Sequence, residues 1–118
     1  MYITRPQEDH AEPVTGDVFV GDVTTDRLAW DSEVFRLSLV RFRSGARTEL
    51  HVHDSDQVLL VHEGRGEVGT GDMRAEVGPG DIVFTPAGEP HFHGAAPGLS
   101  MSHFVVMGRH GTTELFRG

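Results

Sequence analysis

The chain has 118 residues, with 18 acidic and 10 basic side chains and a formal net charge of −8, and it contains no cysteine. This length allows one domain with its own core, and the negative charge argues against nucleic acids and anionic membrane surfaces as partners. Without thiolates, any metal site must use nitrogen and oxygen ligands, so the eight histidines are the residues of greatest interest.

The beginning of the chain shows no targeting signal. Residues 1–13 are polar, contain two prolines and lack a hydrophobic period, so we expect an N-terminal arm that is loose or lies on a neighbour. Residues 14–118 would then form the single domain. No apolar run is long enough for a membrane span, and no basic segment precedes an apolar one as in a signal peptide. We therefore expect a cytoplasmic protein.

The first strands are expected at residues 18–23 and 35–43, and Trp30 to Phe35 leads into the second of them. Apolar residues alternate in this second run, which indicates a half-buried strand with Phe35, Leu37 and Leu39 on one face.

The next stretch, residues 45–64, contains the first histidine pair. His51 and His53 are separated by one residue, so in a strand both side chains point the same way and can share one ion. A tight turn at residues 54–56 would fold the following strand back beside the first. Gln57, in step with Leu59 and Val61, would face the same interior and supply a third donor.

The remaining chain consists of short strand-like runs separated by glycine and proline turns. The tail could form an edge strand through Leu115 and Phe116 or contact another subunit, and neither outcome is expected to affect the site. With no helical period anywhere, the pattern is typical of an all-β sandwich or barrel. The expected strands are residues 67–69 and 73–77, joined by a hairpin turn at 70–72, and residues 82–84, 91–95 and 101–107.

A second histidine pair repeats the spacing of the first. His91 and His93 lie two residues apart in one expected strand, and His103 is in phase with Met101 and Val105 in another. Buried imidazoles need partners, and a metal ion satisfies several of them at once. The other three histidines, His10, His62 and His110, are expected at the surface.

These residues resemble the two motifs of the cupin family. The first runs from Gly45 through His51-Val52-His53 and Gln57 to Gly64, with glutamine in place of the usual glutamate. The second runs from Gly80 through Pro86-Ala87-Gly88 to His91, and Ala95 stands where asparagine often ends it. The resemblance implies an antiparallel jelly-roll barrel.

A narrower resemblance is to the small manganese-dependent cupin hydroxynitrile lyases and to the cupins found beside carboxymuconolactone decarboxylase domains. It is carried by residues 45–48, the His-x-His pair with Gln57, and residues 80–83, 86–89, 91, 93–97 and 101–103. The resemblance also implies a homodimer formed through N-terminal strands. It implies a metal held by His51, His53, Gln57 and His91, in a pocket lined by Thr48, His93 and His103.

Three neutral imidazoles and an amide leave the charge of a divalent ion uncancelled, which favours the binding of an anion. Four protein ligands would leave open positions on Mn or Fe, and also on Co or Ni, whereas a structural Zn site is closed at four. We expect Mn or Fe, with Zn, Ni and Co as other possibilities.

Three functions are compatible with such a site. The first is a lyase acting on a small molecule, in which His103, helped by His93, takes a hydroxyl proton from a cyanohydrin. The second is a metal-dependent dioxygenase of the quercetinase-like cupin type, and the third is a non-catalytic module that binds a small ligand through the metal.

Several side chains have two possible roles. His93 and His103 could instead provide hydrogen-bonded support or packing, and Thr48 could bind a substrate oxygen or be structural. Phe42, Leu59, Phe84, Phe92 and Met101 could form the apolar wall of a pocket, although most of them are also expected in the core of any sandwich.

Overall fold

The computed structural model describes residues 1–28 and 31–118, so Trp30 lies outside the described residues. Strands dominate the fold, and no helix among the described residues is long and apolar enough to span a membrane. The elements are the 3₁₀ helix η1 (Glu8–His10) and the strands β1 (Glu12–Pro13), β2 (Phe19–Arg27), β3 (Phe35–Thr48), β4 (His51–His53), β5 (Gln57–Gly64), β6 (Gly66–Gly69), β7 (Arg74–Val77), β8 (Ile82–Thr85), β9 (Phe92–Ala95), β10 (Met101–Gly108) and β11 (Thr113–Leu115).

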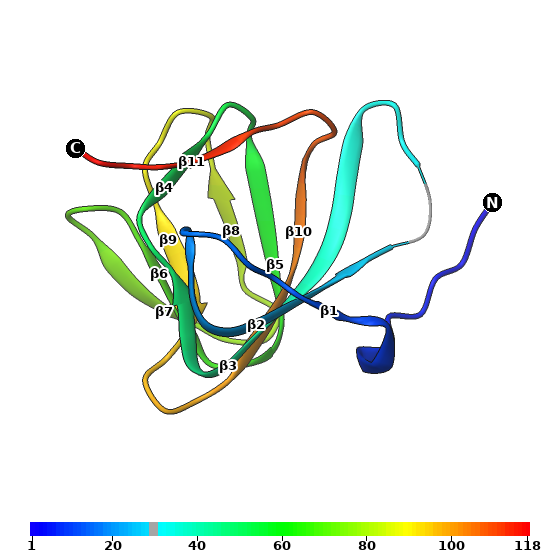
Figure 1. Cartoon of the computed structure of the whole chain (residues 1–118), viewed down its shortest axis with the longest axis horizontal. Coiled ribbons are helices and arrows are strands. Elements are labelled where there is room, and N and C mark those ends of the chain that lie inside the picture. The colour runs from blue at the N-terminus through cyan, green and yellow to red at the C-terminus, as the bar shows by residue number, and fades with distance from the viewer. Residues whose placement is uncertain (29–30) are drawn as a thin grey trace.

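The strands form one curled antiparallel sheet and a small two-stranded sheet (Figure 1). The large sheet runs in the order β7-β6-β9-β3-β10-β5-β8, with β2 also paired to β3 and β1 to β2, and the second sheet pairs β11 with β4. Figure 1 shows the sheet curving around an interior that is crossed by β4 and β11 on one side and by β2 in front. The predicted all-β jelly roll is confirmed.

Strand β3 is the longest element and continues five residues beyond its expected end. It passes through Ser44 and Gly45, whose φ angles of 52° and 77° lie in the left-handed region. At Gly45 an added Cβ would lie 3.3 Å from the backbone nitrogen of Gly98, so the glycine also permits a close approach of two segments. The strand thereby reaches the segment that carries the histidines.

The two faces of β3 have different surroundings. On the apolar face Leu39 is 1 % exposed and Phe35 is 37 % exposed, whereas the alternate residues Arg36, Ser38 and Val40 line the cavity. Alternation fixes two faces but does not say which one the curled sheet encloses. That choice depends on the direction in which the whole sheet curves.

The interior is divided lengthwise into an apolar core and a cavity that is lined by both polar and apolar side chains. Each long strand contributes to both: β10, for example, places Met101 in the core and Met107 in the cavity wall. Hydrophobic burial at one end therefore fixes the strands that present polar side chains at the other. The buried core consists of Val23, Phe42, Ala46, Val61, Val68, Val77, Ala95 and Met101.

The predicted turn between β4 and β5 exists, but the two strands do not lie side by side. β4 pairs with β11, whereas β5 lies between β10 and β8. The turn residues bind other loops: carboxylate oxygens of Asp54 and Asp56 accept hydrogen bonds from the amides of Thr112 and Ala87, at 2.7 and 2.9 Å. The pairing of β4 and β5 with other strands corrects the expected hairpin, whereas the hairpin between β6 and β7 is confirmed.

Candidate metal centre

Three of the predicted histidines meet where β4 crosses the start of β9. The backbones of His51 and His91 form an isolated bridge with two N–H to carbonyl hydrogen bonds of 2.9 Å. Their ring centroids lie 4.3 Å apart, and the ring of His53 lies 4.9 Å from His51 and 5.0 Å from His91. The site is thus assembled by strand register rather than by one local motif.

His93 flanks the same pair from the other side. Its ring lies 5.3 Å from that of His51 and stacks at 5.8 Å on that of His91. One nitrogen from each of His51, His91 and His93 can be chosen so that all three lie within 4.8 Å of one another, a spacing that could hold a metal ion. All four imidazoles are buried.

Backbone carbonyls set the tautomers of the central pair. Nδ1 of His51 lies 2.8 Å from the carbonyl oxygen of Glu49, and Nδ1 of His91 lies 2.9 Å from that of Glu89. A carbonyl only accepts, so each Nδ1 carries the proton and each Nε2 keeps its lone pair. Nε2 of His91 is buried without a hydrogen-bond partner, as expected for a nitrogen that is free to bind a metal.

His53 and Gln57 approach each other at the edge of this cluster. The side-chain nitrogen of Gln57 lies 3.0 Å from Nε2 of His53, and the amide oxygen of Gln57 is buried without a partner. On its far side, Nδ1 of His53 lies 2.9 Å from Oγ1 of Thr113 and 3.3 Å from the Thr112 carbonyl. The C-terminal strand β11 therefore orients a candidate ligand, which corrects the expectation that the tail does not affect the site.

His93 and His103 form a hydrogen-bonded pair. Nε2 of His103 lies 3.0 Å from Nδ1 of His93, and the ring of His103, which is fully buried, packs 5.4 Å from that of Phe42. Thr48 supports the pair from the backbone side, because its hydroxyl accepts a hydrogen bond of 3.1 Å from the His93 amide. Nδ1 of His103 is buried and has no hydrogen-bond partner.

Burial keeps these imidazoles neutral. Desolvation lowers the pKa of His51 to about 4, reinforced by the neighbouring His91 and His53 and opposed by the hydrogen bond to Glu49. Desolvation also lowers the pKa of His103 to about 4, and it lowers the pKa of His93 well below its usual value, helped by His103. Neutral imidazoles are the form that binds metals and accepts protons.

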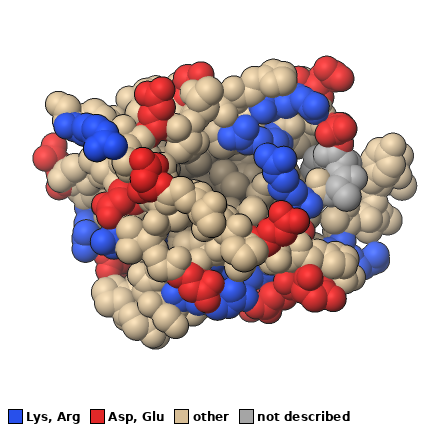
Figure 2. All heavy atoms as spheres, in the orientation of Figure 1, with Lys and Arg blue, Asp and Glu red and all other residues tan. Residues whose placement is uncertain are grey.

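A cavity of about 480 Å³ is lined by His51, His53, His93 and His103, and His91 is not among its lining residues. Figure 2 shows the molecule hollowed near the centre of this view, with basic side chains beside the hollow. Gln57 and Thr48 also line the cavity, together with parts of β2, β3 and β10. Its wall also includes residues 14–19, the segment that follows the expected N-terminal arm.

None of the five apolar residues that could form the pocket wall lines this cavity, and three of them are buried, as expected for core residues. Phe42, Leu59 and Met101 are buried in the protein, and Phe84 is 60 % exposed. The cavity wall instead contains Arg27, Arg36, Ser38, Val40 and Met107, which were not predicted from the sequence. The β3 residues among them alternate with Phe35, Leu37 and Leu39, so they lie on the opposite face of the predicted strand.

Residues 38–107 match the family model of the cupin domain, which covers more than half of the chain. The chain is a cupin. Its sequence is 40 % identical over 112 residues to an (R)-mandelonitrile lyase of Granulicella tundricola, and the match covers 92 % of this chain and 86 % of the relative.

Solved structures share the fold of this cupin. A cupin-like protein of Thermotoga maritima is 29 % identical, with a TM-score of 0.83 and coverage of 91 % of this chain and 85 % of that one. The polyketide cyclase RemF of Streptomyces resistomycificus is 23 % identical with the same TM-score of 0.83, and the match covers 99 % of this chain and 88 % of that one. The second likeness shows the fold alone.

The donor set of this cupin suits a divalent metal ion. Two neutral imidazoles have their Nε2 lone pairs available, and the amide oxygen of Gln57 is a hard donor without another partner. The structure also brings His53 and Thr48 to the same cavity. The remaining histidines, His10, His62 and His110, are exposed, as predicted from the sequence.

Proposed function

We propose that this cupin is a metal-dependent lyase that cleaves cyanohydrins, with Mn or Fe held by His51, His53, Gln57 and His91. The observation that carries the proposal is the buried His93–His103 pair, joined at 3.0 Å beside these donors. The 40 % identity to an (R)-mandelonitrile lyase over most of both chains supports the same reaction. A pair of neutral imidazoles next to a metal site is suited to removing a proton from a bound hydroxyl group.

The protein side chains have different roles in the proposed reaction. In the proposed reaction the His93–His103 pair takes the hydroxyl proton, the carbon–carbon bond to the nitrile breaks with its electron pair on cyanide, and an aldehyde or ketone remains. When bound, the metal supplies Lewis acidity that stabilises the developing negative charge. Gln57 adds no charge to the site, in contrast to a glutamate, so that this Lewis acidity is not reduced.

Contacts with neighbouring side chains hold the His93–His103 pair in position. The Thr48 hydroxyl fixes the backbone of His93 at 3.1 Å, and Phe42 packs against both imidazoles, at 5.7 and 5.4 Å between ring centroids. The surrounding apolar core excludes water from His103, which is fully buried. A proton passed between the two rings therefore stays within the protein until the product leaves.

The test is a cleavage assay on the purified protein. We expect the Mn-loaded or Fe-loaded form to release benzaldehyde from mandelonitrile, EDTA to abolish the release, and added metal to restore it. His103→Ala should lower kcat by about 10²-fold or more, the usual contribution of one proton-transfer group, while bound metal stays constant. The exposed His62→Ala serves as control. Absence of chelator-sensitive cleavage in both metal forms would remove the lyase function.

The same variant separates the lyase from a module that binds a ligand without turnover. A binding module predicts that His103→Ala retains ligand affinity and that no product forms with the unaltered protein. Titration calorimetry with benzaldehyde, together with the cleavage assay, distinguishes the two functions.

A further inference from the structure

Two arginines lie next to each other on the cavity side of the β2–β3 pair. Arg27 on β2 is directly opposite Ser38 on β3, and Arg36 is two residues from Ser38 and so shares its face. Diagonal neighbours of this kind are separated by about 7–8 Å at the backbone, within reach of long side chains. Both arginines line the cavity that contains the site histidines.

Strand register connects Arg36 to the metal centre. Met107 on β10 is opposite Arg36 on β3 and also opposite Gln57 on β5, so the three residues form one row across the sheet. Two strand spacings separate the ends of this row, about 10 Å at the backbone.

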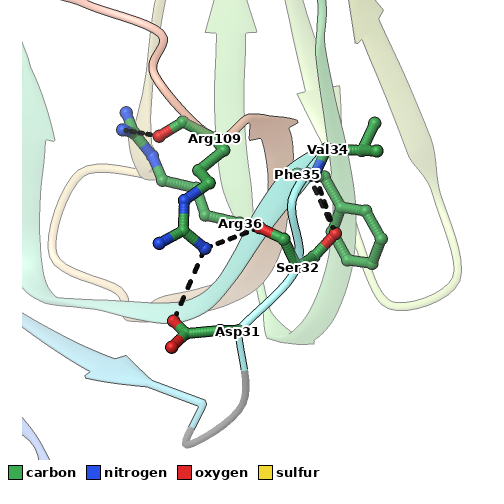
Figure 3. Close-up of polar contacts among 6 residues, drawn as sticks. All are labelled: Asp31, Ser32, Val34, Phe35, Arg36 and Arg109. Carbon is green, nitrogen blue, oxygen red and sulfur yellow. Dashed lines mark hydrogen bonds and ion pairs between the residues drawn. The ribbon is translucent and has the colours of Figure 1, made fainter.

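The guanidinium of Arg36 has only neutral partners. It donates to the Arg109 carbonyl at 3.3 Å and to the sulfur of Met107 at 3.2 Å. The contrast with Arg109 is visible in Figure 3: Arg109 meets the carboxylate of Asp31 at 3.5 Å and the Ser32 carbonyl at 2.6 Å. Arg109 is therefore neutralised within the protein, and Arg36 is not.

Arg27, like Arg36, has no carboxylate partner among residues 1–28 and 31–118. No carboxylate oxygen of these residues lies within 4.0 Å of a guanidinium nitrogen of Arg27 or Arg36. Burial, followed by the charge of Arg27, lowers the pKa of Arg36, with Asp54 opposing the shift. The cavity lining contains one acidic residue, the exposed Asp17, against two arginines. A protein with a net charge of −8 thus keeps unpaired positive charge at its site.

We propose that Arg27 and Arg36 bind a carboxylate on the substrate while the reacting hydroxyl end lies at the histidines. The inference rests on the proposed function and names its substrate class: hydroxynitriles whose carbonyl product carries a carboxylate. A planar guanidinium fork matches a carboxylate with two parallel hydrogen bonds, and a second arginine adds charge. A neutral hydroxynitrile would leave both guanidinium groups without a counter-charge.

The first test compares two substrates. The ratio of kcat/KM for 4-carboxymandelonitrile to that for mandelonitrile should be well above one for the unaltered protein. It should fall about 10- to 100-fold in Arg36→Gln and in Arg27→Gln, the range for losing a charge-assisted hydrogen bond. Arg36→Lys keeps the charge but not the fork, so it should restore part of the ratio. Arg74→Gln, which removes an arginine on the outer β7 strand, should leave the ratio unchanged.

The second test needs no turnover. Titration calorimetry of the metal-loaded protein should show 4-formylbenzoate binding more tightly than benzaldehyde, and Arg36→Gln should remove most of the difference while bound metal, measured by mass spectrometry, stays constant. Selective carboxylate binding without cyanohydrin cleavage would support this inference and refute the lyase function. Cleavage of mandelonitrile without any carboxylate preference would support the lyase function and refute this inference. Equal affinity for both aldehydes, or an equal effect of Arg74→Gln, would overturn the role of the two arginines.

Discussion

The buried histidines should make the metal-free protein sensitive to acid, and His103 gives the clearest magnitude. Its imidazole is fully buried and its pKa is lowered to about 4, against 6.5 in the unfolded chain. Between these values the unfolded state binds a proton that the folded state does not, so folding stability falls as the pH falls from about 6.5 to 4 and no further below that. A difference of about 2.5 pKa units corresponds to about 3 kcal/mol.

The assay is urea unfolding of EDTA-treated protein at several pH values between 7.5 and 4. His103→Gln removes the titrating group, so the free energy of unfolding of this variant should lose about 3 kcal/mol less over the same range. Carboxylates contribute equally to both proteins and cancel in the comparison. The exposed His10→Gln is the control and should follow the unaltered protein. If His103→Gln loses as much stability as the unaltered protein, proton exclusion at His103 does not contribute to acid sensitivity.

Three further changes test the site and its support. Gln57→Glu should bind the metal more tightly but lower kcat, because the carboxylate cancels part of the charge of the metal ion. Metal titration and the cleavage assay measure the two effects, and an unchanged kcat would contradict the role given to Gln57. Thr113→Val removes the hydroxyl 2.9 Å from Nδ1 of His53 and should weaken metal binding about tenfold or more, measured by competition with a chelator. Leu39→Ala should cost about 2–5 kcal/mol in urea unfolding because Leu39 is 1 % exposed, whereas Leu60→Ala, at a residue that is 36 % exposed, should cost clearly less.

The ligand candidates could be predicted because their spacing is local. His51 and His53, like His91 and His93, lie two residues apart, and a strand places such pairs on one face regardless of its neighbours. The phase of Gln57 with Leu59 and Val61 was equally local, and all three are buried. Turns marked by glycine and proline then predicted most of the strands that carry them.

The walls of the cavity could not be predicted in the same way. The alternation in β3 predicts two faces but not which of them borders the cavity, and the face with Arg36 and Ser38 lines it. Likewise, nothing in the spacing of Thr113 indicated that β11 would pair with β4 and reach His53. These contacts depend on residues about 60 positions apart in the chain.

The sequence by itself therefore determined the strand pattern, the cupin motifs and the side chains available to a metal, because each follows from residue type and spacing over a few residues. Only the tertiary structure decided which face of the sheet is enclosed, that His93 and His103 are hydrogen-bonded to each other, and where the unpaired arginines lie. The physical reason is that strand pairing and curvature are set by the burial of the whole sheet. That burial places Arg27 and Arg36 at the same cavity as the histidines.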